Sequence, residues 1–140
     1  MLPIVRRRSE PDTLAPDGSE IRLLVTGPEQ DITRGSLCEV CLPEGQVSIP
    51  IVHRTVEEIW YVLAGRGEVW RQLPNEEVRT VIAQPGDALP IPRSCRFQFR
   101  SLGPGPFIFL CLTMPPWPGP DEAVLLEEGG WPVLSSTDQP

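Results

Sequence analysis

The amino-acid sequence predicts an all-β domain, and two observations carry that prediction. Short apolar segments of strand length recur about every eight to twelve residues, which is the spacing found in sandwiches and closed barrels. The chain also holds 18 prolines and 12 glycines in 140 residues, and these residues break helices and form tight turns. No stretch has a convincing amphipathic helical pattern; the segment 120–128 predicts a turn or two at most.

Each expected strand is bounded by a turn signal. The segment 57–65 is the clearest, because it is dense in β-branched and aromatic residues. Pro50 lacks a backbone N–H, so it places the segment 46–54 at an edge or a bulge. The expected strands span 20–25, 35–42, 46–54, 57–65, 66–73, 77–83, 87–92, 95–102 and 103–114.

The chain divides into a barrel with two extended arms. Residues 1–20 form a charged N-terminal arm, 21–114 the barrel, and 115–140 a tail rich in Pro and Trp. Two exposed tryptophans would be costly, so Trp117 and Trp131 indicate that the tail packs on the barrel or on a partner subunit. Open sheet edges favour pairing between copies, and we expect a homodimer.

The charge pattern excludes several functions. The formal net charge is -7, which is unfavourable for phosphate binding, so nucleic acid is not an expected partner. All 12 cationic side chains are arginine, which excludes Schiff-base chemistry on lysine. The sequence shows no signal-peptide pattern and no membrane-spanning run, so we expect a cytoplasmic protein that does not bind membranes.

The four cysteines are expected to be reduced thiols in that compartment. Cys38 and Cys41 have the spacing of a redox or zinc pair, but residues three apart in a strand face opposite sides. A structural zinc site needs two further ligands at suitable spacing, and the sequence offers none.

The middle of the chain follows the spacing of two known motifs. Glu58, six residues and Gly65 fit the second half of G-x5-H-x-H-x3,4-E-x6-G. The second motif, G-x5-P-x-G-x2-H-x3-N, is matched in spacing at Gly86, Pro92, Ser94, Phe97 and Ser101. Over roughly residues 36–114 the chain therefore resembles the cupin superfamily. This resemblance implies a double-stranded β-helix, also called a jelly-roll barrel, that can host many unrelated functions.

The first motif leaves the register before Glu58 open. Counting back without a gap puts Val52 and Arg54 in the two histidine positions of the motif. A turn shorter by one residue puts His53 and Thr55 there instead. A slip of one residue moves every side chain of a strand to the opposite face, so the two registers predict different interiors.

The resemblance implies that the metal site is degenerate. Phe97 takes the place of the histidine in the second motif and has no atom that can coordinate a metal ion. We therefore expect no tightly bound metal. If a divalent metal such as Fe, Mn, Zn or Ni binds, His53 and Glu58 are its ligands, with Gln98 and waters as the nearby additions.

Glu58 is the candidate catalytic residue. A carboxyl that faces an apolar barrel must be paired, hydrated or protonated, and Arg54 lies near enough along the hairpin to pair with it. Such a pair can be purely structural, and His53 can be an ordinary strand histidine. Alternatively, a buried carboxyl serves as a general acid or base.

The leading functional prediction is a barrel that binds a small anionic or apolar organic molecule. Two alternatives stand beside it: a metal-dependent cupin enzyme of the oxygenase or isomerase type, and a non-catalytic ligand sensor. The predicted ligand-binding residues are Arg54, Trp60, Phe97, Phe99 and Gln98.

Overall fold

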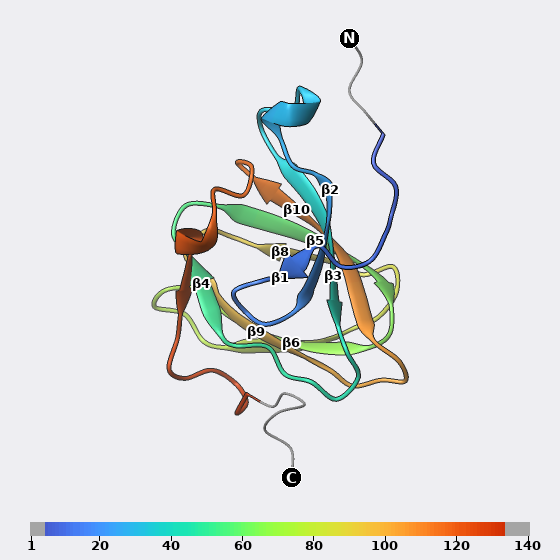
Figure 1. Cartoon of the computed structure of the whole chain (residues 1–140). Helices are drawn as coiled ribbons and strands as arrows, with labels where there is room; N and C mark the ends of the chain where they lie inside the picture. The colour runs from blue at the N-terminus through green and yellow to red at the C-terminus, as the bar shows by residue number, and fades with distance from the viewer. Residues whose placement is uncertain (1–4, 134–140) are drawn as a thin grey trace.

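The computed structural model describes residues 5–133 and has two antiparallel β-sheets that face each other (Figure 1). The strand order is β1-β2-β3-β10-β5-β8 in the first sheet and β11-β4-β9-β6-β7 in the second. The jelly-roll barrel predicted from the sequence is confirmed. The strands are β1 (Thr13–Leu14), β2 (Glu20–Val25), β3 (Ser36–Leu42), β4 (Ile51–His53), β5 (Glu57–Ala64), β6 (Gly67–Gln72), β7 (Arg79–Ala83), β8 (Ala88–Ile91), β9 (Arg96–Ser101), β10 (Phe107–Met114) and β11 (Ala123–Leu125).

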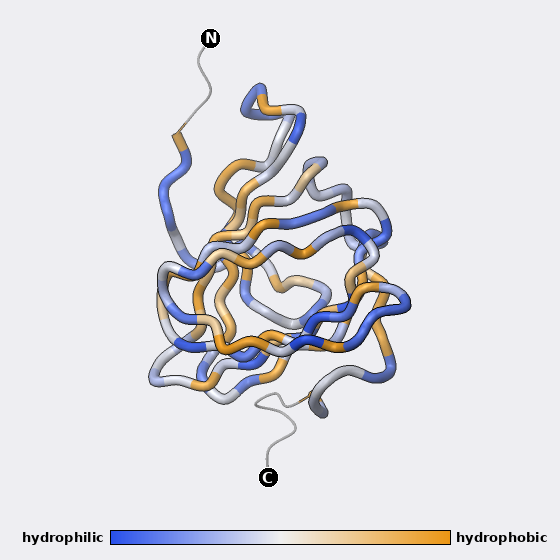
Figure 2. Tube along the Cα trace, turned by 180° about the vertical axis from the view of Figure 1, so that it is seen from behind, coloured by the Kyte–Doolittle hydropathy of each residue, from blue (hydrophilic) through white to orange (hydrophobic). Residues whose placement is uncertain are grey.

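Strict alternation along the central strands builds the core. In β5, Glu58, Trp60 and Val62 are buried, whereas the residues between them are exposed. The same period in β10 buries four side chains, and the rings of Trp60 and Phe109 stack with centroids 4.1 Å apart. Apolar segments from both sheets line the interior (Figure 2). An alternating strand with one face toward the core is what fixes the register of each pairing.

Two segments differ from the sequence prediction. The expected strand 46–54 is regular only at Ile51–His53, because Pro50 cannot donate to a ladder; Val47 forms an isolated bridge to Arg100. In the segment 120–128, where a turn or two of helix at most was expected, a single 3-10 turn, η2 (Pro120–Glu122), does form, but it is followed by a strand that was not predicted, β11. β11 pairs with β4 and covers what would otherwise be a sheet edge.

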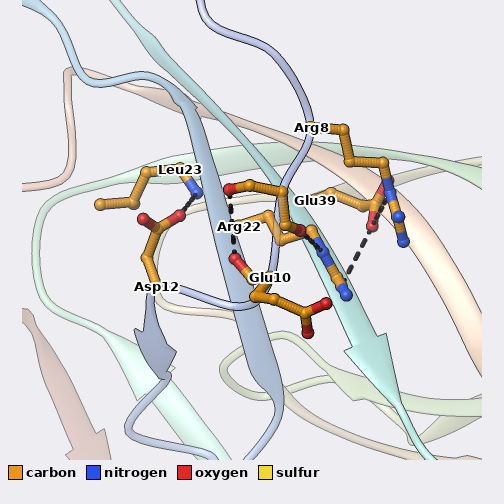
Figure 3. A network of polar contacts seen from close by, with 7 residues as sticks. Arg8, Glu10, Asp12, Arg22, Leu23 and Glu39 are labelled. Atoms are coloured by element: carbon orange, nitrogen blue, oxygen red, sulfur yellow. Dashed lines mark hydrogen bonds and ion pairs between the residues drawn. The ribbon is translucent and has the colours of Figure 1, made fainter.

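The N-terminal arm is fastened to the outer face of the first sheet (Figure 3). Both carboxylate oxygens of Glu39 accept hydrogen bonds from Nε of Arg8, at 2.9 and 3.0 Å, and Arg22 lies 3.4 Å away. Asp12 accepts a hydrogen bond of 2.8 Å from the Leu23 amide. This bond is the main reason that the pKa of Asp12 is lowered. The arm then turns to the barrel opening, where β1 pairs with β2.

The described part of the C-terminal tail first contacts β3 of the first sheet, where the Trp117 amide donates to the Ser36 hydroxyl at 3.0 Å, and then runs along the second sheet through β11 and Trp131. The amide of Trp131 donates to Oε1 of Gln98 at 2.9 Å, and Nε2 of Gln98 donates to the Trp131 carbonyl at 2.8 Å. The guanidinium of Arg100 sits 4.4 Å from the centre of the Trp131 ring, a cation–π contact. Among residues 5–133 there is no helix of the length and apolarity that crossing a bilayer requires.

Two turn glycines, Gly65 and Gly86, allow a test of how closely the backbone packs around the β5–β6 turn. Gly65 and Gly86 both have positive φ, but a Cβ at Gly65 would overlap the carbonyl oxygen of Pro106, and a Cβ at Gly86 would meet open space. Gly86→Ala is expected to cost about 1 kcal/mol of unfolding free energy for the backbone alone. Gly65→Ala is expected to cost about 2 kcal/mol more, because backbone must move. Urea unfolding of both variants checks this; equal losses would contradict the steric contribution.

Candidate functional site

A partly open cavity of about 310 Å³ lies between the sheets, at the end of the barrel that the arm covers. Its walls come from the inner faces of β2, β3, β4, β5, β9 and β10 and from arm residues 13–17 and 19. The lining is largely aliphatic and aromatic, with a few polar groups, which is the composition of a small-molecule site.

The strand register places Ile51, His53 and Glu58 together on this inner surface. All three line the cavity, and each is less than 9% exposed. Ile51 and His53 are two residues apart in β4, so their side chains share a face. Four residues then separate His53 from Glu58. This is the longer of the two spacers that the first cupin motif allows, so Ile51 and His53 take its two histidine positions.

Both registers considered from the sequence are therefore wrong. Val52 and Arg54 do not line the cavity, because β4 turns alternate residues outward. Thr55 is exposed in the turn after β4, where its hydroxyl donates to Glu122. The sequence could not decide among the spacers, since the turn between β4 and β5 shifts the phase of the alternation.

The carboxylate of Glu58 is held in a fixed orientation. It is 7% exposed and accepts hydrogen bonds from Nε1 of Trp60 at 3.0 Å and from the Thr113 hydroxyl at 3.1 Å. The expected ion pair with Arg54 does not form. The Arg54 side chain is exposed and donates from Nε to the Asp121 carbonyl at 2.9 Å, on the far side of the β4–β5 turn.

His53 is 5% exposed, and its Nδ1 atom has no hydrogen-bond partner among the described residues. Its ring makes edge contacts with Phe97 and Trp117, with centroid distances of 5.2 and 5.3 Å. A buried imidazole nitrogen without a partner costs about 1–3 kcal/mol. His53 is thus not satisfied by the protein groups around it, in contrast to an ordinary hydrogen-bonded strand histidine.

Asp17 is a cavity residue that the sequence analysis did not identify. It comes from the arm, is buried, and accepts hydrogen bonds from the Ser19 amide at 2.9 Å and the Ser19 hydroxyl at 2.6 Å. Burial raises the pKa of Asp17, and the nearby charge of Glu58 raises it further. Its carbonyl also accepts from the Ile49 amide at 2.8 Å, which fixes the arm at this point. The Asp17–Gly18 pair indicated only a turn in the sequence.

The predicted ligand-binding set is brought together only in part. Trp60 and Phe97 line the cavity, but Arg54 does not. Gln98 faces the outer side of its sheet and is occupied by Trp131 and by the Ser48 carbonyl. Phe99 is fully buried in the core and does not reach the cavity. Alternation explains the placement of Gln98, because neighbouring residues in β9 cannot share a face.

The cysteines behave as the strand pattern predicts. Cys38 points into the cavity, whereas Cys41 is outside its lining. Cys38 lies directly opposite Cys111 on β10. Burial raises the pKa of the Cys111 thiol well above its ordinary value, with contributions from Cys38 and from the charge of Glu58. A neutral thiol of this kind is a poor nucleophile.

Residues 38–113 match the family described as the Cupin domain. The chain belongs to the cupin family. It is 32% identical over 122 residues to an uncharacterised protein of Methanocaldococcus jannaschii, covering 84% of this chain and 94% of that protein.

Cupins of known structure share the fold at low sequence identity. Bacillus subtilis oxalate decarboxylase, which has Mn(II) centres, superposes with a TM-score of 0.70 at 18% identity over 84% of this chain. Lactobacillus farciminis oxalate decarboxylase gives 0.70 at 20% identity, and CapF gives 0.66 at 17%. The chain spans about a third of the length of these proteins: 30%, 33% and 32%, respectively.

The residues present do not fit the metal site that the cupin motifs imply. The four motif positions hold Ile51, His53, Glu58 and Phe97, of which only two carry donor atoms. Asp17 lies nearby, yet within residues 5–133 no group of three or more His, Cys, Asp or Glu is arranged to hold a metal ion. Two ligands do not make a tight site for these metals.

Glu122 braces the turn that carries the site. Its carboxylate accepts hydrogen bonds from the Thr55 amide at 2.6 Å, the Thr55 hydroxyl, and the Val56 amide at 3.4 Å. Burial by itself raises the pKa of Glu122, but these hydrogen bonds outweigh burial and lower the pKa below its ordinary value of 4.5. The charged carboxylate is therefore the form that stabilises the fold.

Glu122→Gln is expected to lower the free energy of unfolding by about 1–3 kcal/mol at pH 7, because hydrogen bonds to a buried carboxylate are weakened. Since the folded-state pKa is lowered, this contribution is present above the ordinary pKa of 4.5 and disappears as the pH falls through the folded value. Denaturant unfolding from pH 7 to pH 3 measures the difference. The exposed Glu128, as Glu128→Gln, is the control; a loss independent of pH would contradict the role of the charge.

Proposed function

We propose that this cupin barrel binds a small, largely apolar organic molecule in the cavity, without a tightly bound metal. The carrying observation is that the mainly apolar cavity is lined by His53, whose buried Nδ1 atom has no hydrogen-bond partner among the described residues, and by the oriented carboxylate of Glu58. Trp60 and Phe97 supply the apolar walls. For any reaction of the bound molecule, Glu58 is the group we assign to proton transfer, because its carboxylate is oriented and lines the cavity.

The alternative of a metal-dependent enzyme has weaker support. The oxalate decarboxylase of Bacillus subtilis has Mn(II) centres, but the positions of Ile51 and Phe97 in this chain offer no donors. The second alternative, a non-catalytic ligand sensor, would bind its ligand in the same cavity as an enzyme would. Only the absence of turnover would distinguish the sensor from an enzyme, so the ligand has to be identified first.

Ligand binding is expected to stabilise the protein measurably. Native mass spectrometry of protein purified without added metal checks for a retained organic molecule and for metal. A ligand at 100 times its Kd adds about 2.7 kcal/mol to the unfolding free energy. This corresponds to a Tm increase of several degrees in a thermal-shift screen of small aromatic and alicyclic compounds.

A pair of size variants tests whether the cavity is the binding site. Ala15→Phe introduces a large side chain into the lining, whereas Ala88→Phe adds the same bulk at an exposed position outside it. Ala15→Phe should abolish the ligand-induced shift and Ala88→Phe should retain it. Near-stoichiometric metal that is lost in His53→Ala or Glu58→Ala would overturn the metal-free part of the proposal.

A further inference from the structure

The charged side chains that line the cavity are acidic. Two carboxyl groups, Asp17 and Glu58, reach it from different parts of the chain. Among the described residues no arginine lines the cavity, and the sequence contains no lysine. His53 is therefore the single lining side chain that can carry a positive charge, within the part of the chain that the structure describes. An anionic ligand would enter this space without a permanent cation to pair with.

The aromatic walls add a second feature. Trp60, Phe97, Phe109 and Trp117 all line the same cavity as the two carboxyl groups. The face of an aromatic ring attracts a cation by about 0.5–2 kcal/mol, and most strongly where water is excluded. Carboxyl groups combined with aromatic faces are the chemistry that recognises organic ammonium ions.

His53 adds a third polar group to the lining, and its buried Nδ1 atom has no hydrogen-bond partner among the described residues. In the neutral imidazole one ring nitrogen accepts a hydrogen bond and the other donates one. A neutral His53 thus has one ring nitrogen able to accept a hydrogen bond from an N–H donor of a ligand. An ammonium group has three such donors, and Glu58 and Asp17 accept hydrogen bonds as well.

We propose that the cavity selects an organic cation, an amine with an aromatic or alicyclic body, over neutral or anionic molecules of the same shape. This inference rests on the proposed function and specifies its ligand class. It replaces the anionic ligand expected from the sequence, which depended on an inward-facing Arg54.

Asp17 places a second carboxyl group in the cavity, in addition to that of Glu58. Burial and the charge of Glu58 make a second carboxylate here unfavourable, as the raised pKa of Asp17 reflects. A cation bound near both groups offsets their repulsion, so the positive charge of the ligand contributes more than it would in water. Because Asp17 belongs to the arm, the arm supplies a specificity-determining group as well as covering the barrel.

The test uses three probes of matched shape with the full-length protein: 2-phenylethylamine, 2-phenylethanol and phenylacetate. Isothermal titration calorimetry at constant pH and low salt measures each Kd. The amine is expected to bind at least about tenfold more tightly than the alcohol, and the carboxylate most weakly, since one charge-assisted contact is worth roughly that factor.

Three amide variants assign the effect. Asp17→Asn keeps the oxygen that accepts from Ser19, and Glu58→Gln keeps an acceptor for Trp60, so both are expected to fold; Tm verifies this. Each should reduce the advantage of the amine over the alcohol by about tenfold. Asp121→Asn removes the same charge at an exposed position outside the cavity and should leave that advantage unchanged.

The outcomes separate this inference from the proposed function. Equal or tighter binding of the alcohol or the carboxylate overturns the cationic ligand class and leaves small-molecule binding intact. An amine preference that falls equally in Asp121→Asn overturns it too, because the overall charge of -7 would then be the cause. Binding of none of the three probes overturns both for molecules of this size.

Discussion

The interior of this barrel depends on the phase shift between β4 and β5. His53 and Glu58 are five residues apart, so an uninterrupted strand would turn them to opposite faces. The intervening turn resets the alternation, and both side chains point inward. Glu122 holds that turn through the Thr55 and Val56 amides, and β11 pairs with β4 beside it. The C-terminal segment thereby determines which residues of the central strands reach the cavity.

Because of this phase shift, the orientation of the β5 residues could be predicted from the sequence, but the orientation of His53 could not. Alternation within one strand is a local signal, so the inward positions of Glu58 and Trp60 followed from their own segment. The register of His53 depended on a turn whose brace lies 67 residues away in the chain, at Glu122. No local pattern carries that information.

Residues from the two arms were hidden for a related reason. Asp17 lies in an Asp-Gly turn whose local chemistry is satisfied by Ser19, so the sequence indicates a surface turn. It is buried only because the arm crosses the barrel opening, where Ile49 and β2 hold it. Gln98 shows the opposite case: the tail through Trp131 buries a polar residue on the outer face of its strand.

The apolar residues at two motif positions also have a structural logic. Ile51 and Phe97 lie directly opposite each other on β4 and β9, so the two positions without donor atoms form one cross-strand apolar pair. Packing of this pair accounts for those two residues. It does not account for His53, whose Nδ1 atom has no partner within residues 5–133, or for two carboxyl groups in a cavity that no arginine of this part of the chain lines.

An apolar side chain in place of Asp17, His53 or Glu58 would avoid a desolvation cost of about 1–3 kcal/mol. Local departures from stability rules of this kind gather at functional sites. The three polar groups share one cavity although they come from the arm, β4 and β5, whereas the remaining lining is mainly apolar. Under the proposed function, a bound molecule with donor groups and an apolar body would offset part of this cost, which gives these polar residues a reason to be in the barrel that its folding does not supply.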